Sequence, residues 1–286
     1  MSPGANAEWT ESILYDFCSQ PECADGIGPL YGPTLGPGNI LYGVAGYAAF
    51  QLTPGSGGWT YNLLYTFCGK VGCNPMSSLT RDAKGNLYGE GGNGECCGLV
   101  FALHPEPNGQ WNQIVLYDFQ EGGENGIEPL GGVTFHGGGL YGVTLSGGSN
   151  CVKNGGCGTI FELTRGSGNS INEQVVWNFG GDGGAQGLGP SQAVTFDKRG
   201  DLFGVTGEGG EGCGGGGCGV AYGMRQQKSG QWAYQVLHTF NGSDGVEPDG
   251  VLTIDSKGNL YGTTGGGGPN GGGEVFELSP TTQASK

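Results

Sequence analysis

Positive charge is scarce in this sequence: 11 Lys and Arg residues stand against 26 Asp and Glu, which gives a formal net charge of -15 over 286 residues. Nucleic acids and anionic membranes bind proteins through basic faces that replace their counterions. The scarcity of Lys and Arg therefore argues against both partners. It favours a neutral or cationic ligand and a soluble protein.

The sequence also lacks any apolar run near the roughly 20 residues that a membrane-spanning helix needs, so we expect no membrane insertion. Its start, MSPGANAEW, has neither the basic first residues nor the apolar middle of a signal peptide. We interpret residues 1–8 as a loose, disordered tail. We expect an exported protein whose signal peptide is absent from this chain.

Glycine is abundant, at 67 of 286 residues, and it lacks the Gly-X-Y period of collagen. The glycines cluster between the apolar runs, as turn and loop residues do. The composition therefore predicts a chain rich in loops, with a thin core in each structural unit.

The apolar runs belong to a tandem repeat with a period of about fifty to sixty residues and four strand-like runs per unit. One mark of the unit is a phenylalanine that ends an apolar run, at Phe17, Phe67, Phe119, Phe179 and Phe240. Another is Leu-Tyr-Gly or Leu-Phe-Gly, with its aromatic residue at Tyr42, Tyr88, Tyr141, Phe203 and Tyr261. Five copies of each mark predict an all-β fold, a five-bladed β-propeller of four-stranded blades that forms one domain over residues 9–286.

Each expected strand alternates apolar and polar residues, as a half-buried strand must. Strand one of the five units is expected at residues 33–36, 78–82, 133–136, 193–197 and 251–255. Strand two is the Leu-Tyr-Gly run, and strand three is expected at residues 49–52, 100–103, 160–163, 220–224 and 275–278. Strand four begins near Trp59, Trp111, Glu173 and Trp232. The turns between strands one and two contain Asp82, Asp197 and Asp255.

One strand is left over at each end of the chain. Trp9 to Phe17 has the sequence of a fourth strand with no unit before it, and Glu274 to Pro280 is a third strand with no fourth strand after it. We expect the N-terminal strand to complete the last blade, which would close the ring and remove exposed sheet edges.

The ten cysteines fall in close pairs, one pair in each repeat: Cys18 and Cys23, Cys68 and Cys73, Cys96 and Cys97, Cys151 and Cys157, Cys213 and Cys218. Local disulfides are the favoured interpretation, and zinc is the competitor, although tetrahedral sites would need distant loops to meet. The adjacent pair in the second repeat would be a vicinal disulfide or two free thiols. Disulfides indicate an oxidising compartment, so we expect a secreted or cell-surface protein.

In this strand order, the loops from strand four to the next strand one and the loops from strand two to three lie on the same face. We call it the loop face. Every cysteine pair is expected there, and long glycine-rich loops that are held by disulfides are typical of a surface that must keep a shape. We therefore expect the loop face to be the functional one.

The full repeat signature is D-x-x-G-N-L-Y-G-T-T, then G-G, G-x-V-F-E-L-x-P, L-Y-x-F and D-G-x-x-P; at the end of the chain it is seen as LYGTT from Leu260 and EVFELSP from Glu274. It resembles the GloVer tandem repeat, a family named for Gloeobacter and Verrucomicrobia, over Trp9 to Pro280. The resemblance implies a bacterial protein that is exported or on the cell surface. The family carries no assigned reaction, so the resemblance implies no catalytic residue.

Acidic residues on the loop face are the candidates for chemistry. Glu128, Glu247 and Asp249 precede or begin strand one at the channel mouth, where a pair of carboxylates could perform glycoside hydrolysis. The plain alternative is that they are solvated loop acids. Four acids in the loops from strand two to three extend this candidate ligand site: Glu90, Glu95, Glu208 and Glu211.

No cofactor is required by this chemistry. Asp182 and Asp244 lie in glycine-rich turns whose carbonyl groups could complete an oxygen shell, so calcium is the metal that these turns would hold. The ligand spacing of an EF-hand is absent.

Two functional classes follow. The first is a secreted, lectin-like module that binds a neutral polysaccharide or oligosaccharide, because repeats offer several similar shallow sites whose acid and amide groups suit sugar hydroxyls. The second is a glycoside hydrolase that acts on a polysaccharide through Glu128, Glu247 and Asp249. A purely structural surface protein is the third.

Overall fold

The computed structural model describes residues 10–67, 74–92, 97–150, 156–168, 170–214 and 216–280. Its regular structure is almost entirely β, with two short 3₁₀ turns at Pro21–Cys23 and Pro37–Asn39. None of the helical segments in these ranges is long and apolar enough to cross a membrane. The all-β expectation is confirmed.

The strands form five antiparallel sheets, one for each repeat. The first sheet has the order β1 (Thr34–Leu35), β2 (Leu41–Ala45), β3 (Ala48–Gly55) and β4 (Gly58–Thr66). In the second, β5 (Asn74–Pro75) and β6 (Thr80–Arg81) both pair with β7 (Leu87–Gly92), which is followed by β8 (Leu99–Pro105) and β9 (Trp111–Asp118). The third is β10 (Ile127–His136), β11 (Gly139–Ser146), β12 (Thr159–Arg165) and β13 (Ile171–Asn178).

The fourth sheet is β14 (Thr195–Phe196), β15 (Leu202–Thr206), β16 (Val220–Gln226) and β17 (Trp232–Thr239). In the fifth, β18 (Val246–Pro248) and β19 (Thr253–Ile254) both pair with β20 (Leu260–Gly266), and β21 (Val275–Leu278) pairs with the other edge of β20. Strand one is therefore shorter or more divided than its sequence predicts, because a bend separates its two halves. Only β10 runs through this bend, with a register shift between Leu130 and Thr134.

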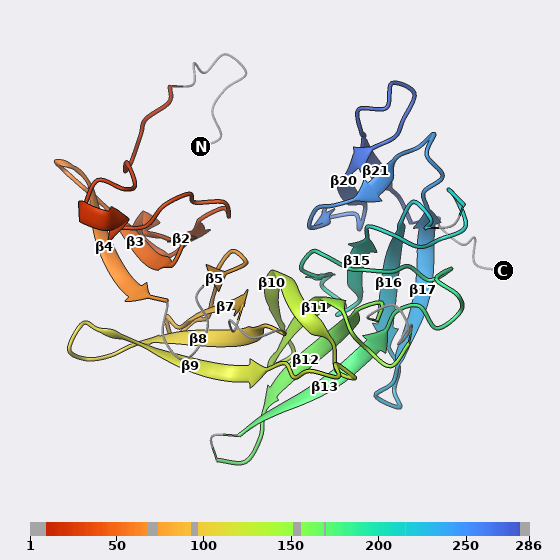
Figure 1. Ribbon diagram of the computed structural model, residues 1–286, viewed down its shortest axis with the longest axis horizontal. Helices are drawn as coiled ribbons and strands as arrows, with labels where there is room; N and C mark the ends of the chain where they lie inside the picture. The colour runs from red at the N-terminus through yellow and green to blue at the C-terminus, as the bar shows by residue number, and fades with distance from the viewer. Residues whose placement is uncertain are drawn as a thin grey trace.

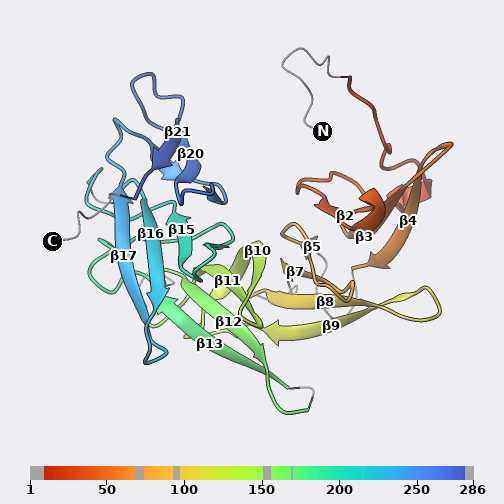
Figure 2. The same cartoon turned by 180° about the vertical axis from the view of Figure 1, so that it is seen from behind.

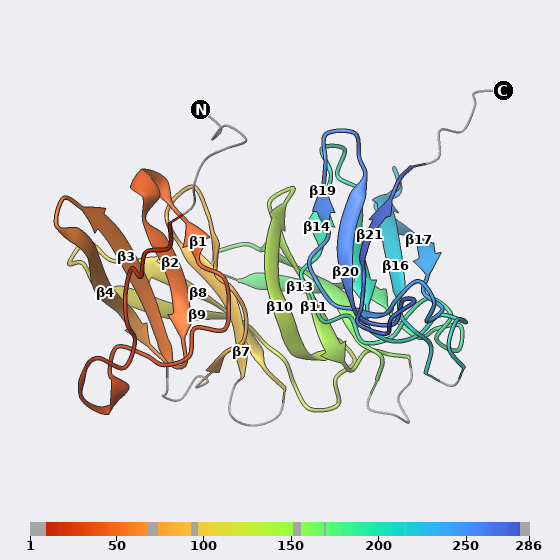
Figure 3. The same ribbon diagram turned by 90° about the horizontal axis from the view of Figure 1, so that it is seen from above.

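The five sheets follow one another around an arc, as Figures 1 and 2 show from opposite sides. In the third sheet, β10 lies toward the inside of the arc and β13 toward the outside (Figure 1). The same antiparallel strand order recurs from sheet to sheet around the arc, which is the radial repetition of a β-propeller. The first sheet and the last sheet stand apart at the opening of the arc (Figure 3).

The two repeat marks meet where neighbouring sheets pack. The phenylalanine that ends each outer strand packs against an aromatic ring on the third strand of the next sheet, as Phe67 does on Phe101 with ring centroids 4.9 Å apart. The glycine of Leu-Tyr-Gly leaves room for that second ring. A Cβ added at Gly89 would lie 2.7 Å from Cζ of Phe101, and one at Gly142 would lie 2.4 Å from Cζ of Phe161.

A line of threonine hydrogen bonds ties the inner strands together. The hydroxyl of Thr34 donates to the carbonyl oxygen of Leu79 in the next sheet. The same bond is made by Thr80 to Val133 at 2.6 Å, by Thr134 to Val194 at 2.7 Å and by Thr195 to Leu252 at 2.8 Å. Each bond joins equivalent positions of consecutive repeats.

The aspartates expected in the turns between strands one and two are confirmed. Asp82 Oδ1 accepts hydrogen bonds from the backbone N–H groups of Lys84 and Asn86, at 2.9 and 2.8 Å. Asp197 and Asp255 do the same in the fourth and fifth sheets. These carboxylates stabilise turns, so they are excluded from the candidate site.

The two ends of the chain differ from the expectation. Residues 10–17 form no strand, and they pack on the first sheet through Leu14, Tyr15 and Phe17 rather than pairing with β21. Within the described ranges the last sheet has no fourth strand, and Trp9 lies outside them. The physical reason is that the two sheets stand apart here, so the segment can bury its aromatic rings only against the sheet that follows it in sequence.

Candidate functional site

The loop face is built by backbone contacts between successive repeats. The N–H of Glu128 donates to the carbonyl oxygen of Cys97 at 2.8 Å, and the N–H of Glu247 donates to that of Cys218 at 3.1 Å. Gly189 makes the equivalent bond to Cys157 at 2.9 Å. The approach to strand one therefore lies against the preceding cysteine loop, and Glu128 and Glu247 occupy equivalent positions of the third and fifth sheets.

These two glutamates hold a backbone conformation that glycine prefers. Their φ angles are 60° for Glu128 and 52° for Glu247, while Gly28 and Gly189 take the same position in two other repeats with φ of 58° and 61°. A residue with a side chain costs about 1 to 3 kcal/mol in a sparsely populated backbone region, and such strain gathers at functional sites. Glycine would adopt this backbone conformation at a lower free-energy cost than Glu128 and Glu247 do.

Both glutamate side chains and that of Asp249 are exposed. Glu128 Oε2 accepts a hydrogen bond of 3.0 Å from the hydroxyl of Ser146. Asp249 Oδ1 accepts one of 3.1 Å from Ser191 and one of 2.6 Å from Nε2 of Gln192, so it joins the fourth and fifth sheets. Carboxylates flanked by hydroxyl and amide groups are the kind of surface that binds sugar hydroxyls.

Sequence reasoning missed Ser146, Ser191 and Gln192. A signal was available for two of them, because Ser191 follows Pro190 as Asp249 follows Pro248. Aligning the repeats on this proline would have grouped Ser191, Gln192 and Asp249. Ser146 carries no such mark, since it lies at the end of β11 and reaches Glu128 only through the pairing of Ile127 with Ser146.

Glu90 was expected in a loop from strand two to three, and this placement is wrong. The residue lies within β7, and its side chain is 0 % exposed. Three other repeats have the buried residues Val44, Val143 and Val205 at this position, so a carboxyl group replaces a core side chain. A group without exposed surface cannot contact a ligand, and Glu90 therefore does not belong to the ligand-contacting set.

The remaining acidic candidates are engaged locally or lie alone. Glu208 is exposed, and its backbone pairs with that of Leu188. Asp182 accepts a bond of 3.1 Å from the N–H of Gln186. Asp244 accepts one of 2.9 Å from the N–H of Asn241 and lies 3.0 Å from Nε2 of His238.

Glu95 lies outside the described residues. Among the residues that the structure does describe, no three His, Cys, Asp or Glu side chains come together as a metal site. Calcium binding in the turns of Asp182 and Asp244 stays a prediction.

Local disulfides are confirmed for two of the five cysteine pairs. Cys18 is bonded to Cys23 with Cα atoms 4.0 Å apart, and Cys213 to Cys218 with Cα atoms 5.4 Å apart. Cys97 and Cys157 are disulfide-bonded as well. The other four cysteines, Cys68, Cys73, Cys96 and Cys151, lie outside the described residues. Each bond between described cysteines closes a short loop rather than joining repeats.

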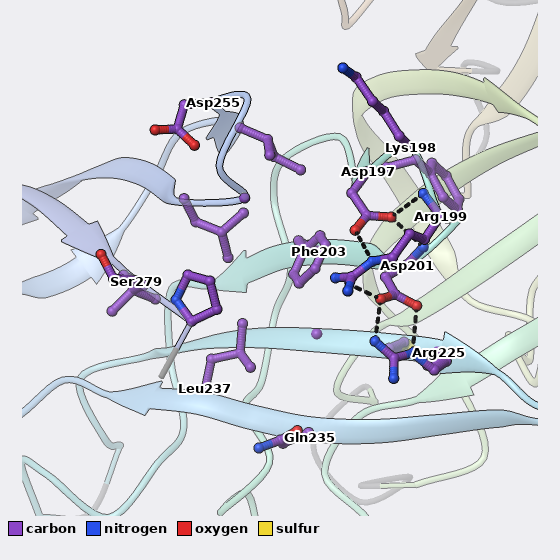
Figure 4. A pocket seen from close by; sticks show the side chains of 18 of the residues that line it. Asp197, Lys198, Arg199, Asp201, Phe203, Arg225, Gln235, Leu237, Asp255 and Ser279 are labelled. Carbon is purple, nitrogen blue, oxygen red and sulfur yellow. Dashed lines mark hydrogen bonds and ion pairs between the residues drawn. The ribbon is translucent and has the colours of Figure 1, made fainter. Parts of the chain in front are cut away.

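A pocket of about 1060 Å³ lies between the fourth and fifth sheets, toward the turns from strand one to two and thus away from the loop face (Figure 4). Its apolar lining includes Phe203, Leu237, Ile254, Leu260 and Leu278.

Ion pairs occupy one end of this pocket (Figure 4). Arg225 donates to Asp201 from Nε at 2.8 Å and from Nη2 at 2.5 Å, and Arg199 Nε lies 3.0 Å from Asp197. The hydrogen bonds that Arg225 donates to Asp201 raise the pKa of the Arg225 guanidinium. Both carboxylates at this end of the pocket therefore have an arginine partner.

No protein-family profile matches the chain, and no curated protein sequence is similar to it. The fold is similar to the extracellular domain of a hybrid two-component system from Bacteroides thetaiotaomicron, with a TM-score of 0.52 and 13 % identity over 88 % of this chain and 28 % of that one.

Weaker likenesses are found to two carbohydrate enzymes. An endo-arabinase from Bacteroides thetaiotaomicron has a TM-score of 0.45 and 10 % identity over 86 % of this chain and 90 % of that one. An alpha-L-arabinofuranosidase from Clostridium thermocellum has a TM-score of 0.42 and 12 % identity over 81 % of this chain and 80 % of that one. At these identities the likenesses concern the fold alone.

Proposed function

We propose that this chain is a secreted or cell-surface bacterial protein of the GloVer type, and that its loop face binds a neutral polysaccharide or oligosaccharide. The observation that carries this proposal is the pair of exposed glutamates, Glu128 and Glu247, held at equivalent positions in a backbone conformation that glycine prefers. Backbone strain of this kind is retained where it serves a function. Ligand binding at the loop face is the function that we assign to it.

The surrounding groups fit a sugar better than an ion or a nucleic acid. Ser146 donates a hydrogen bond to Glu128, and Ser191 and Gln192 donate to Asp249, so hydroxyl or amide groups lie beside two of the three carboxylates. The net charge of -15 disfavours anionic partners. The disulfides that close the loops favour an oxidising compartment, and hence export.

The proposal includes a closed ring of five blades in which the N-terminal strand completes the last one. Closure would surround one channel mouth with equivalent positions from all five repeats. Glu128 and Glu247 would then face a common ligand from two directions.

A glycoside hydrolase is the second candidate, and the same two strained glutamates favour it. Retaining enzymes hold their two carboxyl groups about 5 to 5.5 Å apart, and inverting enzymes about 6.5 to 9.5 Å apart. Hydrolysis would need one of the two carboxyl groups to stay protonated as the acid.

Retention on insoluble polymers tests the proposal. The purified protein is mixed with a panel of plant and microbial polysaccharides, and the unbound fraction is measured against a bovine serum albumin blank. We expect depletion on at least one neutral polymer and none on DNA that is immobilised on a carbohydrate-free resin. If no polymer retains the protein and none releases oligosaccharides, both carbohydrate functions are rejected, and a structural surface role takes their place.

A further inference from the structure

Residues 10–17 hold the same position against the first sheet that every outer strand holds against the sheet that follows it. Phe17 packs edge-to-face on Phe50 with ring centroids 5.0 Å apart. The four later repeats make this contact at nearly the same distance: Phe67 with Phe101 at 4.9 Å, Phe119 with Phe161 at 5.3 Å, Phe179 with Tyr222 at 5.4 Å, and Phe240 with Phe276 at 5.1 Å. Phe17 is thus placed as the end of an outer strand.

A second contact repeats in the same way. Tyr15 stacks on Tyr61 of β4, with ring centroids 4.4 Å apart and planes at 17°. Trp177 of β13 stacks on Tyr234 of β17 at 4.6 Å and 6°. Tyr15 and Trp177 each lie two residues before the phenylalanine of their repeat. The segment is also held by Asp25, whose Oδ2 accepts a bond of 2.7 Å from the Tyr15 hydroxyl.

The last sheet lacks what this segment would supply. Val275 of β21 is 80 % exposed, whereas the equivalent residues Ala49, Val100, Ile160 and Ala221 are all 0 % exposed. Those four are covered because each pairs with an outer strand. Ile13 is exposed as well, at 73 %, while its counterparts Val115 and Val236 pack into the core of the preceding interface.

At the opening between the last sheet and the first sheet, one of the threonine hydrogen bonds that tie the inner strands together is missing. Four threonines donate to the next sheet, and their acceptors, Leu79, Val133, Val194 and Leu252, are no more than 2 % exposed. The fifth threonine is Thr253, and the fifth acceptor position is Pro33. Both residues are exposed.

From these four observations we infer that residues 10–17 are the missing outer strand of the last sheet, already seated on the first sheet, and that the ring closes when β21 pairs with them. This deepens the closed ring of the proposed function and does not depend on its ligand. On closure, Ile13 enters the apolar pocket between the fourth and fifth sheets, against Phe203 and Ile254. Thr253 then donates to the carbonyl oxygen of Pro33.

The other sheets give the register of this pairing. The residue five positions before the repeat phenylalanine pairs with the position of Gln51, Ala102, Glu162 and Gly223 in the third strands. In the last sheet that rule pairs Ser12 with Glu277. It also pairs Tyr15 with Val275, which covers the exposed valine.

A disulfide trap tests the register directly. The double variant Ser12→Cys/Glu277→Cys is oxidised under native conditions, and peptide mapping identifies the bridged peptides. We expect an intrachain bridge between positions 12 and 277 in most molecules. The control, Ser12→Cys/Ser256→Cys, places the second cysteine in the turn before β20, where no bridge is expected. A bridge between two chains, or none in the first variant, overturns the inference.

A second measurement needs no engineered cysteines, so it tests the inference even if the double variant does not fold or does not oxidise. If the ring is open, Ile13→Asp changes an exposed residue and leaves the melting temperature unchanged. If the ring closes as inferred, the same change buries a carboxylate in the pocket and lowers the melting temperature by several degrees.

The matched control is Leu30→Asp, at a residue that is 84 % exposed and whose counterpart Asp249 is exposed as well. Equal melting temperatures for the two variants overturn the inference. Neither test uses a ligand, so its failure leaves the polysaccharide result standing.

Discussion

Glu90 Oε2 accepts a hydrogen bond of 2.7 Å from the backbone N–H of Gly132, which ties the second sheet to the third near the inner strands. Oε1 has no hydrogen-bond partner among the described residues. Gly132 has φ of 96°, a conformation that suits glycine and lies within the register shift of β10. The buried carboxyl group of Glu90 therefore accepts a hydrogen bond from a backbone N–H group in the irregular part of β10.

This carboxyl group should make stability depend on pH. Burial raises the pKa of Glu90 to about 8 from an ordinary value of 4.5, although the bond from Gly132 opposes the shift. Between these values the unfolded chain loses the proton and the folded chain keeps it, so the free energy of unfolding falls as pH rises through this window. The loss is on the order of a few kcal/mol by pH 8.

Glu90→Gln keeps a hydrogen-bond acceptor for Gly132 and removes the titration. We expect the variant to be nearly as stable as the wild type at pH 5 and clearly more stable at pH 8, in urea unfolding followed by fluorescence. Parallel profiles for the two proteins would show that Glu90 is not buried as a neutral acid.

The threonine line should contribute measurably to stability. Thr195→Val keeps the side-chain shape and removes the hydroxyl that donates to Leu252, which should cost about 1 kcal/mol. The exposed Thr60 on β4 is the control, and Thr60→Val should change the free energy of unfolding by less than about 0.5 kcal/mol. Equal changes in the free energy of unfolding for Thr195→Val and Thr60→Val would mean that the threonine hydrogen bonds do not contribute to stability.

The disulfides should shape the loop face more than they stabilise the fold. Closing a loop as short as Cys213–Cys218 contributes about 2 kcal/mol by chain entropy. The carbonyl of Cys218 also accepts the bond from Glu247, so reduction should speed amide exchange at Glu247 before it lowers the melting temperature strongly.

Mass spectrometry checks the cysteine state on which this prediction rests. We expect the native mass to be ten hydrogens below that of the fully reduced chain, since the sequence has ten cysteines. Ten free thiols, or bound zinc in proportion to the protein, would contradict the argument for export.

Much of the fold could be predicted from the sequence because the repeated sequence motifs have a steric cause. Leu-Tyr-Gly recurs since a Cβ at the glycine would collide with the ring of the next strand, as at Gly142 and Phe161. The positions of strands two and three in all five sheets, and of strand four in the first four sheets, followed from these motifs, whereas the fourth strand expected at Trp9 to Phe17 was wrong. Strand one was harder to define, because the bend that divides it leaves no clear pattern in the sequence.

The candidate site was less predictable for two reasons. Glu90 was placed in a loop because a charged residue in a glycine-rich stretch resembles a surface residue. The residues around Glu90 in the sequence do not show that the backbone N–H of the distant Gly132 donates a hydrogen bond to its carboxylate. Ser146 supports Glu128 only through strand pairing. The equivalent placement of Glu128 and Glu247 could be predicted, because an acid before the repeat proline stands out against Gly28 and Gly189.

The role of Glu128 and Glu247 is tested most directly by substituting each with glutamine and measuring both retention and released oligosaccharides on a polymer that retains the wild type. The exposed Glu106, in the turn between β8 and β9 on the opposite face, supplies the control variant, Glu106→Gln. Each of the two site variants should lose about 1 to 3 kcal/mol of affinity per hydrogen bond to the carboxylate, with no product from any protein.

A hydrolase would give another pattern, with sustained release that both variants abolish while retention persists. If Glu128→Gln and Glu247→Gln are retained as well as Glu106→Gln and no product forms, the two glutamates do not line a carbohydrate site, and the central claim is contradicted.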